Sequence, residues 1–229
     1  MMQRLVFGLL WLSFVGYAVL LAPPDQPDIA DLILRLSTGN WDGLNPALIA
    51  LFNAMGLWPM VYAAVALVDG RGQRIWAWPF VGASFAVGAF ALLPYLALRS
   101  PVPWVGPEDR LLRVVGSRLL GASLALAALV LLGWGLIYGD WSAFWQQWQT
   151  SRFVHVMTLD FCALWLLFPV LLIDDLPRRG LRQGWVIPSV LALPLLGAAL
   201  YLALRPPLPR DQSSQAPTLA PVPESSGLG

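Results

Sequence analysis

The polar side chains with the greatest capacity for chemistry lie together in one apolar run, Phe153–Ile173. This run holds the only histidine of the chain, His155, its only cysteine, Cys162, and one carboxylate, Asp160. An ionised aspartate within a bilayer costs about 2.5–3.5 kcal/mol, so such residues usually face a protein interior and often have a function. Asp160 is therefore a candidate proton site or polar ligand contact, and the structural alternative is a hydrogen-bonded acid that ties helices together. The candidate partners in that alternative are Asn53, Ser84 and Ser123.

His155 allows three interpretations. It could be an axial ligand of haem or chlorophyll, a group that titrates near neutral pH, or an interfacial histidine bonded to water or headgroups. A single histidine cannot provide bis-histidine haem ligation within one chain, and a single cysteine fits no metal-binding spacing. We therefore predict no metal and no cofactor, and we expect Cys162 to be an inert thiol.

Asn53 is the predicted counterpart of Asp160 in an earlier apolar run. It precedes Trp58 by five residues, as Asp160 precedes Trp165. Asn53 could form a helix–helix hydrogen bond, worth about 0.6–2 kcal/mol in a membrane. Alternatively, it could line a cavity shared with Asp160, and we include it as a candidate site residue on that ground.

The elements that position these residues are expected to lie in a membrane. The 229 residues are 58% hydrophobic and only 12% charged, about half the charged fraction of a soluble domain. A membrane crossing needs about 20 helical residues, because every backbone polar group must be satisfied internally. The sequence predicts an all-α, polytopic integral membrane protein with six transmembrane helices, at residues 5–22, 47–68, 76–98, 119–138, 153–173 and 185–204.

Two segments between these runs have apolar residues at helical spacing and predict short amphipathic helices at 28–36 and 140–149. Trp141, Trp145 and Trp148 share the apolar face of the second segment. Tryptophan prefers the headgroup level of a bilayer, so we expect these three side chains to contact lipid. Arg110 and Arg113, ahead of the fourth predicted span, are candidates for contact with anionic lipid or for setting topology.

Similar features recur along the chain in the same order. Tyr95-Leu-Ala-Leu-Arg99 closes the third run, and Tyr201-Leu-Ala-Leu-Arg205 closes the sixth. An acidic turn that contains arginine follows the second run and again the fifth. We predict two duplicated three-helix halves, at residues 1–104 and 105–205. An odd number of spans in each half predicts that the second half is inverted in the membrane. The Pro/Ser-rich tail, 206–229, is predicted to be disordered.

The sequence contains no positive signal for catalysis. It lacks a phosphate-binding loop, a dinucleotide fingerprint, a nucleophile elbow and a Cys/His cluster. A net charge of +1, with no basic stripe, also gives no indication of nucleic-acid binding. We therefore predict that the protein is not an enzyme.

Three stretches carry a resemblance to a known group of proteins. They are Phe52-Asn-Ala-Met-Gly-Leu-Trp-Pro59, the run from Trp78-Pro79-Phe80 to Pro94-Tyr95, and the segment that begins His155-Val-Met-Thr-Leu-Asp160. These resemble a group of small multi-spanning membrane proteins of unknown function from cyanobacteria and chloroplasts. The resemblance implies location in a thylakoid membrane or a bacterial plasma membrane, and it supplies no catalytic residues.

The sequence favours a non-enzymatic accessory or assembly protein of an energy-converting, photosynthetic membrane. Its expected partners are the lipid bilayer and subunits of a membrane complex. The alternative is a small-solute or proton-coupled membrane transporter with a site near Asp160 and Asn53, and a third interpretation is a haem or pigment protein.

Overall fold

The computed structural model describes residues 2–100, 109–182 and 184–208, and within these ranges all regular structure is helical. The part of the predicted tail from 209 onward lies outside them. The helices in chain order are α1 (Met2–Leu20), α2 (Ile29–Thr38), α3 (Pro46–Asp69), α4 (Trp78–Val87), α5 (Ala89–Leu98), α6 (Arg110–Val115), α7 (Arg118–Tyr138), α8 (Trp141–Thr150), α9 (Arg152–Arg178), α10 (Val186–Ala192) and α11 (Leu196–Leu204).

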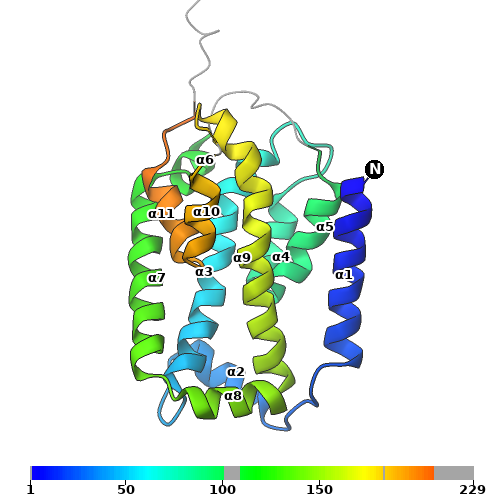
Figure 1. Ribbon diagram of the computed structural model, residues 1–229, viewed down its shortest axis with the longest axis vertical. Coiled ribbons are helices and arrows are strands. Elements are labelled where there is room, and N and C mark those ends of the chain that lie inside the picture. Colours follow the sequence, from blue (N-terminus) through cyan, green and yellow to red (C-terminus); the bar gives the residue numbers. More distant parts are fainter. Residues whose placement is uncertain (1, 101–108, 183, 209–229) are drawn as a thin grey trace, which may run out of the picture.

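Four helices are long and apolar enough to cross a membrane, namely α1, α3, α7 and α9. They lie along the long axis of the molecule (Figure 1), where α3 and α9 run in one direction and α1 and α7 in the other. We call the end where α3 and α9 finish the Asp69/Asp175 end. The four helices coincide with four of the six predicted spans to within a few residues.

The opposite end carries α2 and α8, which lie across the long helices (Figure 1), and we call it the α2/α8 end. Both short helices form where the apolar spacing predicted them. The side chain of Asp140 caps α8 by accepting a hydrogen bond from the backbone N–H of Ala143, at 2.9 Å. In α2, the left-handed Gly39 ends the helix.

The predicted span 76–98 is not one helix but a hairpin of two short helices, α4 and α5. The chain reverses at Gly88, whose φ of 50° and ψ of −126° are not helical. Both ends of this hairpin lie beside the end of α3. A Cβ on Gly70 would lie 2.6 Å from the Cβ of Ala77, just before α4, while Arg99, just after α5, pairs with Asp69.

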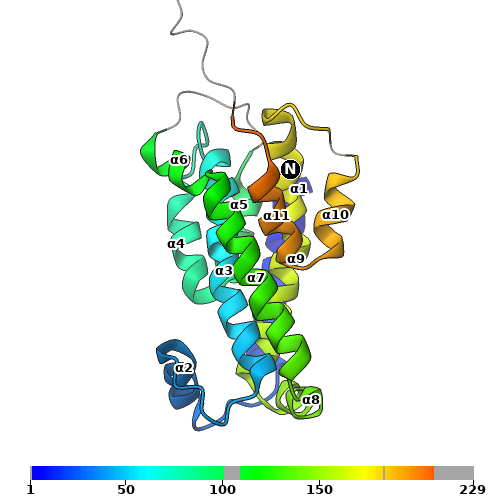
Figure 2. The ribbon, with the colours of Figure 1, turned by 90° about the vertical axis from the view of Figure 1, so that its left-hand side faces the viewer.

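The predicted span 185–204 is likewise a hairpin, formed by α10 and α11. It reverses at Pro194 and Leu195, where Leu195 has a φ of 60°. A proline inside a predicted span is expected to kink or end its helix, and Pro194 does so here. The two arms pack so closely that a Cβ on Gly197 would lie 2.5 Å from the carbonyl oxygen of Val190. Neither hairpin extends to the α2/α8 end (Figures 1 and 2).

Two of the sequence expectations are therefore corrected. The described residues form four long helices and two hairpins, instead of six continuous spans. The inverted arrangement is also wrong, because the two charged turns lie at the same end of the bundle. Arg178, from the second turn, forms an ion pair of 2.8 Å with Asp69, from the first. Inversion had been predicted because each half was expected to have three spans. A hairpin that returns to the end from which it starts leaves each half with two long helices, and an even number does not imply inversion.

The centre of the bundle is the contact between α3 and α9. Trp58, Tyr62 and Phe168 are fully buried there, and the rings of Tyr62 and Phe168 meet edge to face. The hydroxyl of Tyr62 donates to the carbonyl oxygen of Leu164, at 2.7 Å. This packed core fixes the two helices that carry the acidic residues of the candidate sites.

Candidate functional site

Buried charges gather at the Asp69/Asp175 end in two clusters. In the first, Asp69 is fully buried and accepts from Arg99, Arg178 and the hydroxyl of Tyr95. Arg99 also pairs with Asp174. Removing one partner of a buried, hydrogen-bonded ion pair leaves a charge without compensation, so this cluster constrains how the carboxyl ends of α3, α5 and α9 meet.

In the second cluster, Asp175 occupies the position that Asp69 has in the first. Its Oδ2 accepts from Arg179, from Arg205 and from the hydroxyl of Tyr201, at 2.7–2.9 Å. The cluster joins the end of α9 to the end of α11. It therefore ties the second hairpin to its long helix, as the first cluster ties α5 to α3.

The two clusters have the same internal spacing. Tyr95 and Tyr201 each follow the aspartate of their cluster by 26 residues, and Arg99 and Arg205 each follow it by 30. The other arginines, Arg178 and Arg179, do not share a spacing. Each arginine also crosses to the other long helix: Arg99 donates to the carbonyl oxygen of Val170 at 3.5 Å, and Arg205 to that of Ala64 at 3.0 Å. Four pairs of counterparts are thus separated by 106 residues: Asp69 and Asp175, Tyr95 and Tyr201, Arg99 and Arg205, and Ala64 and Val170. The tyrosine–arginine motifs and the acidic turns stood out in the sequence, but their pairing was not predicted.

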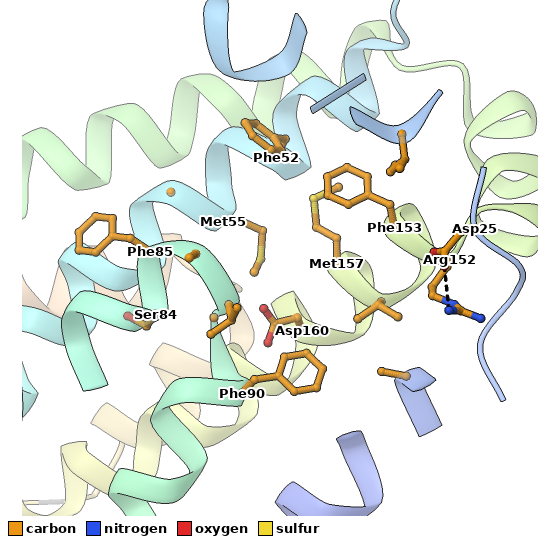
Figure 3. Close-up of a pocket in the computed structure, with 17 residues that line it drawn as sticks. Asp25, Phe52, Met55, Ser84, Phe85, Phe90, Arg152, Phe153, Met157 and Asp160 are labelled. Atoms are coloured by element: carbon orange, nitrogen blue, oxygen red, sulfur yellow. Dashed lines mark hydrogen bonds and ion pairs between the residues drawn. The ribbon is translucent and has the colours of Figure 1, made fainter. Parts of the chain in front are cut away.

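A cavity of about 540 Å³ lies between α1, α3, α9 and the tip of the α4–α5 hairpin. Asp160 lies at its inner end, and Asp25 and Arg152 lie at its outer end (Figure 3), which is at the α2/α8 end of the bundle. Gly88 lies against Asp160 at the inner end. Asp160 lies eight residues along α9 from Arg152, a rise of about 12 Å. The large side chains of the cavity walls between them are aromatic or contain sulfur, namely Phe52, Met55, Phe85, Phe90, Phe153 and Met157.

Asp160 meets the hairpin at the point where its backbone reverses. Its Oδ1 accepts a hydrogen bond of 2.7 Å from the backbone N–H of Ala89, the first residue of α5. A Cβ on Gly88 would lie 2.6 Å from the Asp160 Cγ and still closer to Oδ2, so only glycine fits beside this carboxylate. The positive end of the α5 dipole also faces the carboxylate and stabilises its charge. Asp160 itself is 5% exposed.

The mouth of the cavity carries one ion pair. Arg152 Nη1 lies 2.9 Å from the carboxylate of Asp25, and its Nε donates to the carbonyl oxygen of Pro23. The arginine is thus engaged at the rim, more than two helical turns away from Asp160. Among the residues that line the cavity, Asp160 has no cationic side chain as a described partner.

A second cavity, of about 310 Å³, is enclosed by α3, α7, α8, α9 and the other hairpin. Every residue that α3, α9 and this hairpin contribute to it lies 106 positions from a residue that lines the first cavity. These pairs are Ala47 and Phe153, Ala50 and Val156, Leu51 and Met157, Thr158 and Phe52, Phe161 and Met55, and Pro194 and Gly88. The position equivalent to Asp160 is Ala54, which is fully buried.

The outer helices approach the two cavities differently. On the second side, α7 approaches α3 closely, and a Cβ on Gly135 would lie 2.5 Å from the Cβ of Ala50. On the first side, Tyr17 of α1 lies against His155 of α9, with ring centroids 5.8 Å apart.

Asn53 does not join Asp160 in the site. Its Nδ2 donates to the carbonyl oxygen of Ile49, one turn earlier in the same helix, at 2.8 Å. The cavity is lined instead by its neighbours Phe52, Met55 and Gly56. The separation of 106 pairs Asn53 with Leu159, so the predicted equivalence of Asn53 and Asp160 was displaced by one residue. Of the predicted partners of Asp160, only Ser84 lies in the cavity wall, and its hydroxyl donates to Val81.

His155 has both ring nitrogens engaged within the chain. Nδ1 is 2.9 Å from the carbonyl oxygen of Trp148, which can only accept, so this nitrogen carries the proton. Nε2 lies 2.8 Å from the hydroxyl of Tyr17, and in the neutral ring it accepts a hydrogen bond from that hydroxyl. The ring also stacks on Trp148, with centroids 4.2 Å apart. Of the three interpretations of His155, none anticipated these bonds within the chain, through which the histidine joins α1, α8 and α9.

The residues predicted to contact lipid divide into two groups. Trp141 and Trp145 are exposed on α8, whereas Trp148 is partly buried and stacks on His155. Arg110 and Arg113 are exposed on α6, at the other end of the bundle. The backbone N–H of Leu112 lowers the pKa of Asp109, which caps this helix, and Arg71 contributes a smaller lowering.

No group of three or more potential metal ligands occurs in the part of the chain that the structure describes. Comparison with protein-family models, curated proteins and solved structures gave no match to this chain. The resemblance noted from the sequence therefore stays a prediction, and function must be argued from the geometry alone.

Proposed function

We propose that this protein is a multi-pass membrane protein in which four helices span the bilayer and two hairpins re-enter it. The hairpins α4–α5 and α10–α11 would both enter from the Asp69/Asp175 side. Non-helical backbone at membrane depth is tolerated where protein buries it or where it lines a cavity. The reversal at Gly88 meets both conditions, because Asp160 caps it and a cavity adjoins it.

We further propose that the chain arose by duplication into two halves of the same orientation. Each half would contain a long helix, a helix at the α2/α8 end, a second long helix and a hairpin. The support is the constant separation of 106 between the residues of the two ion clusters and of the two cavities. Parallel repeats of this kind are related by an axis along the membrane normal.

The function that this geometry supports best is transport of a small solute, with its binding site at Asp160. One observation carries the proposal: the larger cavity ends at a carboxylate placed against a broken helix. Binding sites of many membrane transporters lie at such interruptions, near the middle of the bilayer. The cavity volume of about 540 Å³ falls in the range of small-molecule sites. A proton carried by Asp160 would be the coupling ion in a proton-coupled form of this transport.

Uptake by proteoliposomes tests this proposal even though the solute is not identified. Vesicles containing the wild-type protein, the Asp160→Asn variant or the Asp140→Asn variant are incubated with one mixture of small metabolites, and their contents are compared by mass spectrometry. Asparagine can still accept the hydrogen bond from Ala89, so the hairpin should persist while the charge is lost. Asp140 is a matched control, since it also caps a helix but lies at the surface, at the start of α8.

Transport predicts at least one solute that accumulates with the wild type and with Asp140→Asn but not with Asp160→Asn. Identical contents in all three preparations and in empty vesicles would contradict the proposal. The amount of inserted protein and the fraction of molecules in each orientation are measured in every preparation, so that loss of uptake is not confused with loss of insertion.

A second candidate is an accessory or assembly protein of an energy-converting membrane. The observation in its favour is α1, which has membrane length but no buried residue in this chain. An exposed helix of this kind could pack against a subunit of a membrane complex as readily as against lipid. Mild-detergent purification tests it: stable co-purifying subunits that are lost when the exposed face of α1 is changed (Leu5→Ala with Leu12→Ala) would support it, and a partner-free protein would contradict it.

A further inference from the structure

The lining of the larger cavity carries information about the chemical class of its ligand. We propose that the cavity takes an organic monocation: a small apolar or aromatic body bearing one positively charged nitrogen, placed beside Asp160. This inference rests on the proposed solute site and adds the class of solute to it.

The charge at the inner end of the cavity favours a cation. Asp160 uses Oδ1 to accept from Ala89, and no cationic side chain lies beside it among the described lining residues. An anion in the same place would meet this carboxylate. The amino-terminal end of α5 could otherwise attract an anion, but its first N–H group already donates to Asp160. The only arginine of the described lining, Arg152, is paired with Asp25 at the rim.

The walls of the cavity favour an apolar body with a charge that can lie against aromatic faces. Four phenylalanines and two methionines line the space, as Figure 3 shows in part around Asp160: Phe52, Phe85, Phe90, Phe153, Met55 and Met157. Aromatic rings attract ammonium groups through their quadrupoles, and quaternary ammonium ligands are commonly held in this way. A proton alone would need neither the volume nor these walls.

The hairpin tip beside the cavity also suits a ligand with an apolar body. Phe85 and Val87 lie at this tip, line the cavity and are 57% and 49% exposed. If the hairpin re-enters the bilayer, as proposed above, these apolar side chains lie at membrane depth. An apolar ligand body matches such surroundings, and its charged group would be held by Asp160.

The second cavity provides an internal comparison. It has counterparts of the lining residues at a separation of 106 but Ala54 in the position of Asp160. Its described lining contains no charged residue. The larger cavity thus contains a carboxylate, and the smaller cavity does not. We therefore assign cation selectivity to the larger cavity.

Calorimetric titration of the nanodisc-embedded protein tests the inference, with empty nanodiscs subtracted. The probes are benzyltrimethylammonium, its uncharged carbon isostere neopentylbenzene, and the anion phenylmethanesulfonate. The cation and the isostere have the same shape, so their difference in affinity isolates the charge. We expect saturable binding of the cation, at least about tenfold tighter than that of the isostere. The Asp160→Asn variant should lose this preference, and Asp140→Asn should retain it.

The possible results separate the two proposals. Binding of the isostere or the anion as tightly as the cation would overturn the assignment of ligand class and leave a solute site in place. A preference for the cation that survives in Asp160→Asn would also overturn the assignment, because it would locate the selectivity elsewhere. No saturable binding of any probe would contradict both the cation site and the solute site on which it rests.

Discussion

Substitution of Gly88 by alanine probes the hairpin tip and the Asp160 carboxylate together. The backbone of Gly88, with φ 50° and ψ −126°, lies in a region that other residues rarely occupy, so a side chain there costs about 1–3 kcal/mol. The added Cβ would also overlap the Asp160 carboxylate and displace it from the N–H of Ala89. Losing a hydrogen bond to a charged group costs about 1.5–3 kcal/mol. The expected loss of stability is therefore about 2.5–6 kcal/mol.

The assay is reversible unfolding in mixed micelles, followed by tryptophan fluorescence as the fraction of denaturing detergent is raised. Gly82→Ala is the matched control, because Gly82 lies within α4 and a Cβ there would meet nothing within 4 Å. In the Asp160→Ala background the overlap disappears, and Gly88→Ala should cost only the backbone strain of about 1–3 kcal/mol.

The sign of the change in stability caused by Gly88→Ala distinguishes the hairpin from a continuous helix. In a continuous helix, replacing Gly88 by alanine would stabilise the protein by up to about 1 kcal/mol, as expected for Gly82. A Gly88→Ala protein as stable as the Gly82→Ala protein would therefore refute the reversal at Gly88 and the role of Asp160 as its cap.

Two further predictions concern the contacts that hold the ends of the bundle. Asp69→Asn keeps the shape of the side chain but removes the fully buried charge that pairs with Arg99 and Arg178, and should cost about 3–5 kcal/mol in the same unfolding assay. A loss below about 1 kcal/mol would show that the ion pairs of Asp69 contribute little net stability. Tyr17→Phe removes the hydroxyl that donates to His155 and should cost about 1 kcal/mol. It should also increase amide exchange in α1 but not in α7, and equal exchange in both helices would argue against α1 being held through this contact.

The sequence predicted the long helices well because their determinants are local. Runs of about 20 apolar residues specify α1, α3, α7 and α9, and caps such as Ser117 fix where they begin. The two hairpins have the same apolar composition as a span. Nothing within the run 76–98 distinguishes a break at Gly88 from a small residue used for packing, because the break depends on Asp160, which is far away in the chain. Pro194 gave a local signal for the second break.

The candidate site was predicted in part. Asp160 was singled out from the sequence, since a carboxylate in an apolar run stands out by itself, and the structure places it in the lining of the larger cavity. Asn53 does not line the cavity. It was paired with Asp160 because Trp58 and Trp165 were taken as counterparts, and that pairing is one residue out of register with the separation of 106 between residues of the two cavities. The pairing of Asp69 with Arg99 and of Asp175 with Arg205 was missed, although the tyrosine–arginine motifs had been recognised. These partners meet only because each hairpin turns back to the end from which it starts.

The sidedness of three exposed positions tests most directly the arrangement of four spans and two re-entrant hairpins. Arg74, Arg182 and Gln149 are replaced one at a time by cysteine in a Cys162→Ser background, and labelled in oriented vesicles with a thiol reagent that cannot cross the membrane. Arg74 and Arg182 lie in the segments that lead from α3 and α9 into the hairpins, and Gln149 lies on α8. The account predicts that Arg74→Cys and Arg182→Cys are labelled from the same side, and Gln149→Cys from the other. Labelling of Arg74→Cys and Arg182→Cys from opposite sides would contradict it.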